Sequence, residues 1–220
     1  GSVSTGIVWV VPDPADPATT EQRQVSLGIN DGTNIQVTDG LTEGETILAM
    51  NNARKPFDDI RVREAIAHAI DRGAIIEGAM FGYGMPIGTH FAPHHPAYED
   101  LTAISAYDPG RSKALLAEAG FPDGFDATLA LPPPSYARRG GEIVAAQLRA
   151  VGIRPRIINV EWAQWLSHVY GQAQFDLTLI SHVEPPDLGN WSKPGYYWGY
   201  ENPAFNALYE RLRASADEGE

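Results

Sequence analysis

The residues best suited to chemistry follow a strand-like run near the end of the chain. The run Phe175–Ser181 is rich in apolar residues and has the length of a buried strand. An imidazole and two carboxylates come after it, in a turn interrupted by prolines: His182, Glu184 and Asp187. Because ligands in an open α/β sheet bind at the carboxyl ends of the strands, we predict that this turn contacts a ligand. The alternative is a surface turn with solvated carboxylates.

A group of aromatic residues follows this turn. It consists of Trp191 and the run 196–200, in which Tyr197 and Trp198 are central. Aromatic side chains on a loop beside a cleft commonly line small-molecule pockets. We therefore add Trp191, Tyr197 and Trp198 to the predicted ligand-binding residues. The same side chains would also serve to cover the edge of a sheet, and the sequence leaves both readings open.

Three histidines form the best metal-binding candidate in the sequence. His90, His94 and His95 are spaced so that two imidazoles of a helix could bind Zn²⁺ or Ni²⁺. Pro93 and Pro96 favour a loop instead, where spacing fixes no geometry. We therefore predict no metal site and no cofactor.

The sequence lacks the constellations that enzymes need. Ser181 and His182 are adjacent, so they cannot face each other as nucleophile and base. There is no Gly-x-Ser-x-Gly elbow, no His-Glu-x-x-His and no phosphate-binding glycine loop before a helix. We predict a binding protein and not an enzyme.

The elements that would position these residues alternate between strands and helices. Strands are expected at 127–131, 154–160 and 175–181, and helices between them at 139–151 and 162–170. Strand–helix–strand alternation is typical of crossover units that pack helices on a sheet. The predicted fold class is therefore α/β.

Two further helices carry clear end signals. Asp58 or Asp59 would cap one helix, and Asp108 with Pro109 would begin another that ends at Gly120. Arginines follow the first cap, and they suit either a solvated helix face or a ligand-facing charge cluster. The first helix has apolar residues at helical spacing: Val62, Ala65, Ile66, Ala69 and Ile70.

Composition narrows the class of protein. The 220 residues are 43% hydrophobic and 20% charged, which suits one good core, or one domain with an appendage. The net charge of −12 argues against nucleic-acid binding. There are no cysteines and no apolar run long enough to insert into a membrane. Gly1-Ser2 resembles a cloning remnant, so the sequence leaves open whether a leader precedes it.

Two motifs carry a family resemblance. The segments 51–69 and 107–120 resemble the extracytoplasmic solute-binding proteins of ABC importers, in particular the dipeptide/oligopeptide/nickel-binding family. The resemblance implies one lobe of a type II periplasmic-binding-protein fold over about 45–220. It also implies a periplasmic location, a peptide or other small solute as ligand, and an ABC permease as partner of the full-length protein. The chain is then a fragment, and we expect its affinity for a ligand to be weak or absent when it is isolated.

The resemblance also implies a role for Glu184. In the peptide-binding members an acidic residue shortly after this strand pairs with the α-amino group of the ligand. The sequence departs from the usual pattern, because Ile180-Ser181 replaces Gly-Trp and Glu184-Pro-Pro-Asp187 replaces Asp-Pro-Asp. The sequence therefore leaves the class of solute open.

A second resemblance concerns the beginning of the chain. Residues 3–48 are similar to the membrane-proximal β-domain of periplasmic adaptor proteins of tripartite efflux pumps. We therefore predict a β-rich segment at 1–44 and an α/β lobe at 45–220. Because the two resemblances meet near residue 42, an engineered chimera, an efflux-adaptor interaction module and an atypical solute-binding protein remain alternatives.

Overall fold

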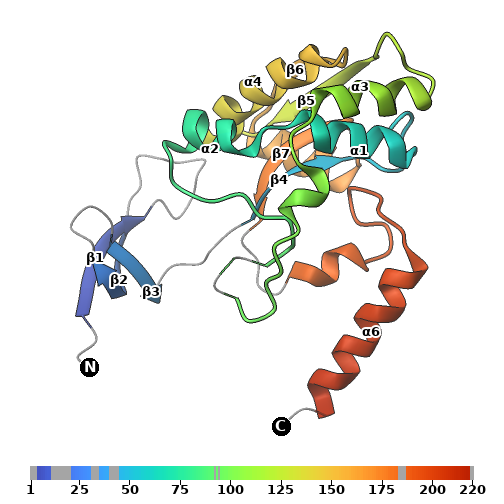
Figure 1. Ribbon diagram of the computed structural model, residues 1–220. Helices are drawn as coiled ribbons and strands as arrows, with labels where there is room; N and C mark the ends of the chain where they lie inside the picture. Colours follow the sequence, from blue (N-terminus) through green and yellow to red (C-terminus); the bar gives the residue numbers. More distant parts are fainter. Residues whose placement is uncertain are drawn as a thin grey trace. The chain divides into compact units, whose positions relative to one another are not determined.

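The chain divides into two compact units, Gly1–Gly44 and Glu45–Glu220, and each is described by itself. The structure is a computed structural model (Figure 1). It describes residues 4–10, 21–30, 35–39, 45–91, 93, 95–182 and 187–218.

The first unit contains a three-stranded antiparallel sheet in the order β1-β2-β3. β1 (Ser4–Val10) pairs with β2 (Glu21–Asn30) in an unbroken register. β3 (Ile35–Asp39) pairs with β2 in a register that shifts twice, as at a β-bulge. The strands lie in the region for which β structure was predicted.

The second unit holds the other elements. One short helix, η2 (Trp165–Gly171), is a π-helix, and η1 (Thr102–Ser105) and η3 (Asp187–Trp191) are 3₁₀ helices. Among the described residues, no helix is long and apolar enough to cross a membrane. In chain order the elements are β4 (Glu45–Met50), α1 (Ile60–Ala69), α2 (Arg72–Met80), η1 (Thr102–Ser105), α3 (Pro109–Glu118), β5 (Asp126–Leu131), α4 (Ser135–Ala150), β6 (Arg154–Asn159), α5 (Trp162–Gln164), η2 (Trp165–Gly171), β7 (Leu177–His182), η3 (Asp187–Trp191) and α6 (Pro203–Glu218).

The second unit is built on a four-stranded sheet in the order β4-β7-β5-β6. β7, β5 and β6 run parallel, and β4 is antiparallel to β7. The helical segments after β5 and β6 return the chain to the start of the next parallel strand, as crossover units do. The α/β prediction is confirmed.

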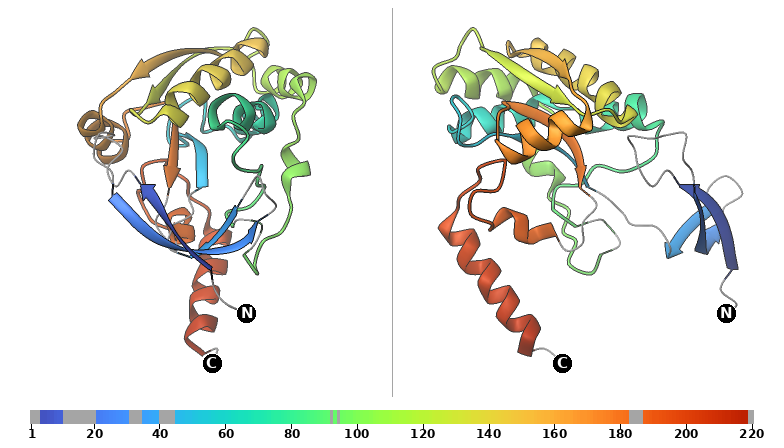
Figure 2. Two further views of the ribbon diagram at one scale, coloured as in Figure 1. Left: turned by 90° about the vertical axis from the view of Figure 1, so that its left-hand side faces the viewer. Right: turned by 180° about the vertical axis from the view of Figure 1, so that it is seen from behind.

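The sheet separates two apolar cores. In the left view of Figure 2, α2 and α4 lie on one side of the sheet and η2 on the other. Alternate side chains of β7 point to opposite sides of the sheet, since Leu177 and Leu179 belong to the first core and Ile180 belongs to the second. The second core is rich in aromatic side chains: Trp165, Phe175, Tyr196, Tyr197 and Trp198.

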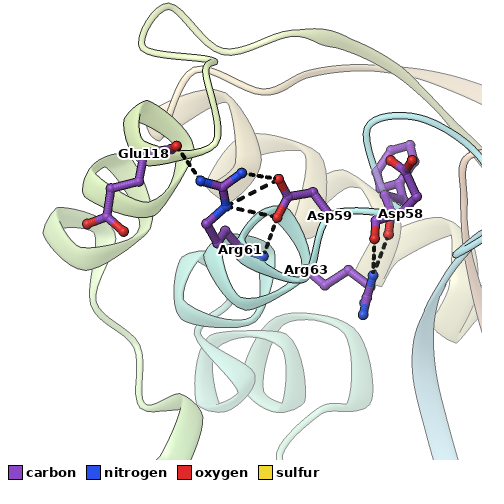
Figure 3. Close-up of polar contacts among 6 residues, drawn as sticks. Asp58, Asp59, Arg61, Arg63 and Glu118 are labelled. Atoms are coloured by element: carbon purple, nitrogen blue, oxygen red, sulfur yellow. Dashed lines mark hydrogen bonds and ion pairs between the residues drawn. The ribbon is translucent and has the colours of Figure 1, made fainter. Parts of the chain in front are cut away.

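The polar residues at the start of α1 act as a helix cap (Figure 3). The Asp59 carboxylate accepts a hydrogen bond from the backbone N–H of Arg61 at 2.9 Å, and it is also paired with the Arg61 guanidinium. Arg61 also donates to the carbonyl oxygen of Glu118 at 2.6 Å, which ties α1 to the end of α3. These contacts are structural and support the reading of a capped helix over that of a ligand-facing cluster.

Two predicted helices differ from the observed ones. α4 begins at Ser135, four residues before the predicted start, because Pro134 stands directly before it in an extended conformation that allows the helix to begin. The helix predicted at 162–170 is α-helical only for Trp162–Gln164 and continues as a π-helix through Gly171.

A pair of glycines lets α4 lie close to the sheet. A Cβ atom on Gly141 would lie 2.3 Å from a methyl carbon of Leu131, and one on Gly140 would lie 2.8 Å from a methyl carbon of Leu179. Leu131 is fully buried, so it has little room to move away. The start of α4 is therefore held against the ends of β5 and β7.

Candidate ligand-binding site

The ends of the strands meet along one edge of the four-stranded sheet. The parallel strands β5, β6 and β7 end at Leu131, Asn159 and His182. β4 runs the opposite way, and its first residue, Glu45, pairs with His182. We call this line of residues the carboxyl edge, which is where ligands bind in open α/β sheets.

Four of the six predicted ligand-binding residues lie together at the end of β7. The ring nitrogen Nε2 of His182 lies 3.0 Å from the hydroxyl oxygen of Tyr197, a hydrogen bond between buried groups. The ring of Trp198 meets His182 edge to face at 5.6 Å and lies 4.6 Å from Trp191. The other two are Glu184, which lies outside the described residues, and Asp187, whose backbone begins η3 but whose side chain is not described.

Trp198 has an unused hydrogen-bond donor. Its side chain is 4% exposed, and its indole Nε1 is buried without an acceptor among the residues that the structure describes. A buried donor without a partner costs free energy, so such groups often mark a place where water or a ligand binds.

The motif Asn51-Asn52 holds the aromatic segment in place. The backbone N–H and the side-chain amide of Asn52 both donate to the carbonyl oxygen of Trp198, at 2.8 and 2.9 Å. Asn51 is buried, and its side chain donates to the carbonyl oxygens of Ala173 and Phe175. The residues that carry the family resemblance therefore position Trp198.

Glu45 is a site residue that the sequence analysis missed. Its carboxylate oxygen lies 3.0 Å from Nδ1 of His90, with side chains 19% and 14% exposed. The strand β4 was not predicted to pair with β7, so nothing in the sequence placed Glu45 opposite His182.

The histidines of the metal candidate point to different partners. His90 faces Glu45, whereas the ring of His95 stacks on Phe91 at 4.3 Å and accepts a hydrogen bond from the N–H of Ala97. His94 lies outside the described residues. In the described part of the chain, no group of three His, Asp or Glu side chains is arranged to hold a metal ion.

The start of α4 brings further polar groups to the carboxyl edge. The hydroxyl oxygen of Tyr136 accepts a hydrogen bond from the N–H of Ser181 at 2.9 Å, and burial raises the pKa of this phenol. Arg138 pairs with Glu161 at 3.3 Å, and the Arg139 guanidinium lies 4.8 Å from the centre of the Phe81 ring. Neither arginine was predicted as a site residue, although two arginines near the start of a helix are unfavourable for its dipole and could have indicated a functional role.

The opposite edge of the sheet has a depression of about 450 Å³. Three of the charged residues that line it, Asp126, Arg154 and Asp176, have charged partners. The Asp176 carboxylate accepts from the N–H and hydroxyl of Thr128 and pairs with Arg54, while Arg154 pairs with Asp126. This depression therefore offers a ligand fewer unmet polar groups than the carboxyl edge does.

Comparison with known proteins identifies the family. The sequence model of the bacterial extracellular solute-binding proteins, family 5, middle region, matches residues 6–202. The chain belongs to this family. Family 5 proteins bind solutes for transport and are not enzymes, which confirms the family, the fold and the non-enzymatic role predicted from the sequence. The match begins at residue 6 and runs across residue 42, and a join of two families at that point stays a prediction.

Three similar proteins illustrate the comparison. The dipeptide-binding protein of Escherichia coli K12 is 30% identical over an alignment of 231 positions, which covers 96% of this chain and 40% of the relative. The dipeptide-binding protein of Pseudoalteromonas sp. SM9913, solved with Met-Leu, is 29% identical with a TM-score of 0.61, over 67% of this chain and 31% of that one. The protein AgaA of A. tumefaciens R10, solved with agropinic acid, is 30% identical with a TM-score of 0.60, over 64% of this chain and 29% of that one.

Proposed function

We propose that this chain is the ligand-binding lobe of a periplasmic solute-binding protein of an ABC importer, and that the solute lies against the carboxyl edge. The observation that carries the proposal is the buried cluster of His182, Tyr197 and Trp198 at the end of β7, in a protein of family 5. Such a site binds a solute and releases it unchanged.

Each side chain has a distinct part in this site. Trp191 is half-buried and offers apolar ring surface, and the indole N–H of Trp198 offers a donor to a carbonyl or carboxylate oxygen. His182 orients the site through its hydrogen bond to Tyr197. Glu184 and Asp187 follow β7 in the sequence, and a carboxylate there would bind an ammonium group of the ligand by a charge-assisted hydrogen bond.

The ligand is a peptide or another small solute. This part of the proposal is supported by relatives solved with Met-Leu and with agropinic acid. We propose an ABC permease as the partner that receives the solute, and the periplasm as the location. The chain spans 40% of the length of the E. coli relative, so these statements concern the full-length protein.

Thermal unfolding of the chain with a panel of ligands tests the proposal. The panel contains Met-Leu, other di- and tripeptides, sugars and organic acids, and unfolding is followed by near-ultraviolet circular dichroism. A ligand that binds only the native state raises the midpoint, with about 2.7 kcal/mol of stabilisation at a hundred times its dissociation constant. We expect one ligand class to raise the midpoint in a concentration-dependent way.

Two matched histidine variants test whether the rise in the unfolding midpoint comes from a ligand bound at the carboxyl edge. His182→Gln removes the imidazole at the carboxyl edge, whereas His168→Gln changes an exposed histidine of η2. The shift in midpoint should be lost in the first variant and kept in the second. A shift that both variants keep contradicts the placement of the solute at His182.

A further inference from the structure

The turn that carries Trp191 is too short to fix its own position. η3 is a 3₁₀ turn of five residues, and the N–H of Ser192 closes it by donating to the carbonyl oxygen of Gly189 at 3.1 Å. Short 3₁₀ turns have poor hydrogen-bond geometry and gain little stability from it. The Trp191 ring nevertheless packs at 4.6 Å from the Trp198 ring. Contacts from another element therefore hold η3 in place.

The last helix, α6, supplies such contacts from one face. It extends away from the four-stranded sheet (Figure 1). Of its described side chains, those of Phe205, Asn206 and Tyr209 are half-buried and the others are exposed. The rings of Phe205 and Tyr209 lie nearly parallel with their centres 6.5 Å apart. This half-buried face is the one that packs on the rest of the second unit.

Tyr209 lies directly against the backbone of η3. A Cβ atom on Gly189 would lie 2.5 Å from the hydroxyl oxygen of Tyr209 and 3.1 Å from its Cζ atom. The end of the phenol ring therefore occupies the space that a side chain would take. The φ angle of Gly189 is not positive, so its backbone conformation would also suit alanine. The close approach of Tyr209 is what requires glycine at this position.

A second set of contacts joins the start of α6 to Trp191. Oδ1 of Asn202 accepts hydrogen bonds from the N–H groups of Ala204 and Phe205, at 3.0 and 3.2 Å, and so caps the helix. The side-chain amide of Asn202 donates to the hydroxyl oxygen of Tyr200 at 3.1 Å. The ring of Tyr200 meets that of Trp191 edge to face at 5.6 Å. The position of Trp191 is therefore tied to α6 through its backbone and through its ring.

We infer that Tyr209 is a positioning residue for the ligand-binding site. Its ring packs on Gly189 and fixes η3, which sets the place of Trp191 beside Trp198. The inference rests on the proposed function, in which Trp191 offers ring surface to the solute. Tyr209 acts on the solute only through η3.

The indole N–H signals of the full chain in a ¹H–¹⁵N NMR spectrum test this positioning without any ligand. The chain has five tryptophans, and Trp191→Phe identifies the Trp191 signal. Tyr209→Ala should shift this signal, because η3 loses its support. Leu212→Ala is the matched control, since Leu212 lies on the same helix and is 52% exposed. The control should leave the Trp191 signal in place.

Gly189→Ala tests the same contact from the side of η3. The added methyl group would meet the Tyr209 hydroxyl, so the Trp191 signal should shift. Tyr209→Phe deletes that oxygen and keeps the ring, so by itself it should shift the signal little. The double variant should lie closer to the parent than Gly189→Ala does, because substitutions of residues in contact are not additive. Circular dichroism confirms that each variant is folded.

Titration of each variant with Met-Leu measures the consequence for binding. Tyr209→Ala and Gly189→Ala should weaken the affinity about three- to tenfold, which is the contribution of one aromatic contact. Tyr209→Phe and Leu212→Ala should bind as the parent does. A tyrosine with only a structural role would lower the stability in urea and leave the affinity for Met-Leu unchanged.

Two results overturn the inference. One is a Trp191 signal that neither Tyr209→Ala nor Gly189→Ala moves, and this result can be read whether or not Met-Leu binds. The other is a shifted Trp191 signal with an unchanged affinity for Met-Leu. A different result bears on the proposed function: if Met-Leu binds the parent without moving the signals of Trp191 and Trp198, the placement of the solute is wrong and the positioning of Trp191 by Tyr209 stands.

Discussion

At the residue scale, Asp59 links the stability of the chain to pH. The hydrogen bonds and charge of Arg61 lower the pKa of this carboxyl to about 2, from an ordinary value of 3.8. A carboxylate with a depressed pKa stabilises the folded state above the ordinary pKa, and this contribution is lost as the pH falls toward 2.

Asp59→Asn tests this link, because asparagine still caps α1 but carries no charge. The variant should be less stable than the parent at pH 7, and the difference should shrink between pH 4 and pH 2. Urea unfolding across this range measures it. Arg61→Gln removes the partner of Asp59, so the free energy of unfolding of this variant should depend less on pH between pH 4 and pH 2. A stability difference that stays constant from pH 7 to pH 2 contradicts the assignment.

Asn52 is a second residue whose removal has a defined effect. Its side-chain amide donates to the carbonyl oxygens of Met50 and Trp198, both at 2.9 Å. Asn52→Ala removes both bonds and should cost about 1–2 kcal/mol of unfolding free energy. It should also change the near-ultraviolet signal of the aromatic cluster, because Trp198 loses an anchor.

Gln172→Ala is the matched control for Asn52→Ala. Gln172 is exposed at the end of η2, so its truncation should change the free energy of unfolding by about 0.5 kcal/mol or less. If the two variants lower the free energy of unfolding equally, Asn52 has no special role in anchoring Trp198.

At the scale of elements, the close approach of α4 to the sheet depends on Gly141. Gly141→Ala improves helix propensity by about 1 kcal/mol but places a methyl group against the buried Leu131. Overpacking costs about 1–3 kcal/mol, so we expect a net loss of stability. Urea unfolding measures it, with the exposed Glu142→Ala on the same helix as the control. A stabilised Gly141→Ala variant would contradict the packing of α4.

The sequence predicted those elements whose ends carry local signals. Asp59 and Asp108 are the N-caps of α1 and α3, and each accepts a backbone hydrogen bond from the first turn of its helix. The apolar positions predicted for the first of these helices are buried. The start of α4 was predicted four residues too late. Pro134 precedes this helix and makes no side-chain hydrogen bond to its first turn, so the sequence has no capping residue there. The π-helical turns of η2 depend on packing against the sheet, which periodicity does not reveal.

The candidate site was predicted only in part, for a similar reason. His182, Trp191, Tyr197 and Trp198 follow one strand, so their order in the sequence reveals their proximity. Glu45 and Arg138 reach the same edge from distant parts of the chain. Only the pairing of β4 with β7 and the crossover after β5 bring them there, and neither can be read from local spacing.

At the scale of the whole molecule, the two edges of the four-stranded sheet differ in how their polar groups are satisfied. At the opposite edge, which holds the depression, Asp176 accepts hydrogen bonds from Thr128 and pairs with Arg54, and Arg154 pairs with Asp126. At the carboxyl edge, donors on Trp162, Arg138 and Trp198 are buried without acceptors among the described residues. Because unmet buried donors are costly, this asymmetry favours the carboxyl edge as the place where a solute binds.

Mapping a bound solute on the full chain tests this claim most directly. The solute that stabilises the chain most in the thermal panel is titrated into ¹⁵N-labelled protein, and backbone amide shifts are followed. The account predicts the largest shifts at 131–138, 159–162 and 180–198. Shifts that are largest around Asp126, Arg154 and Asp176, at the depression on the opposite edge, would contradict it.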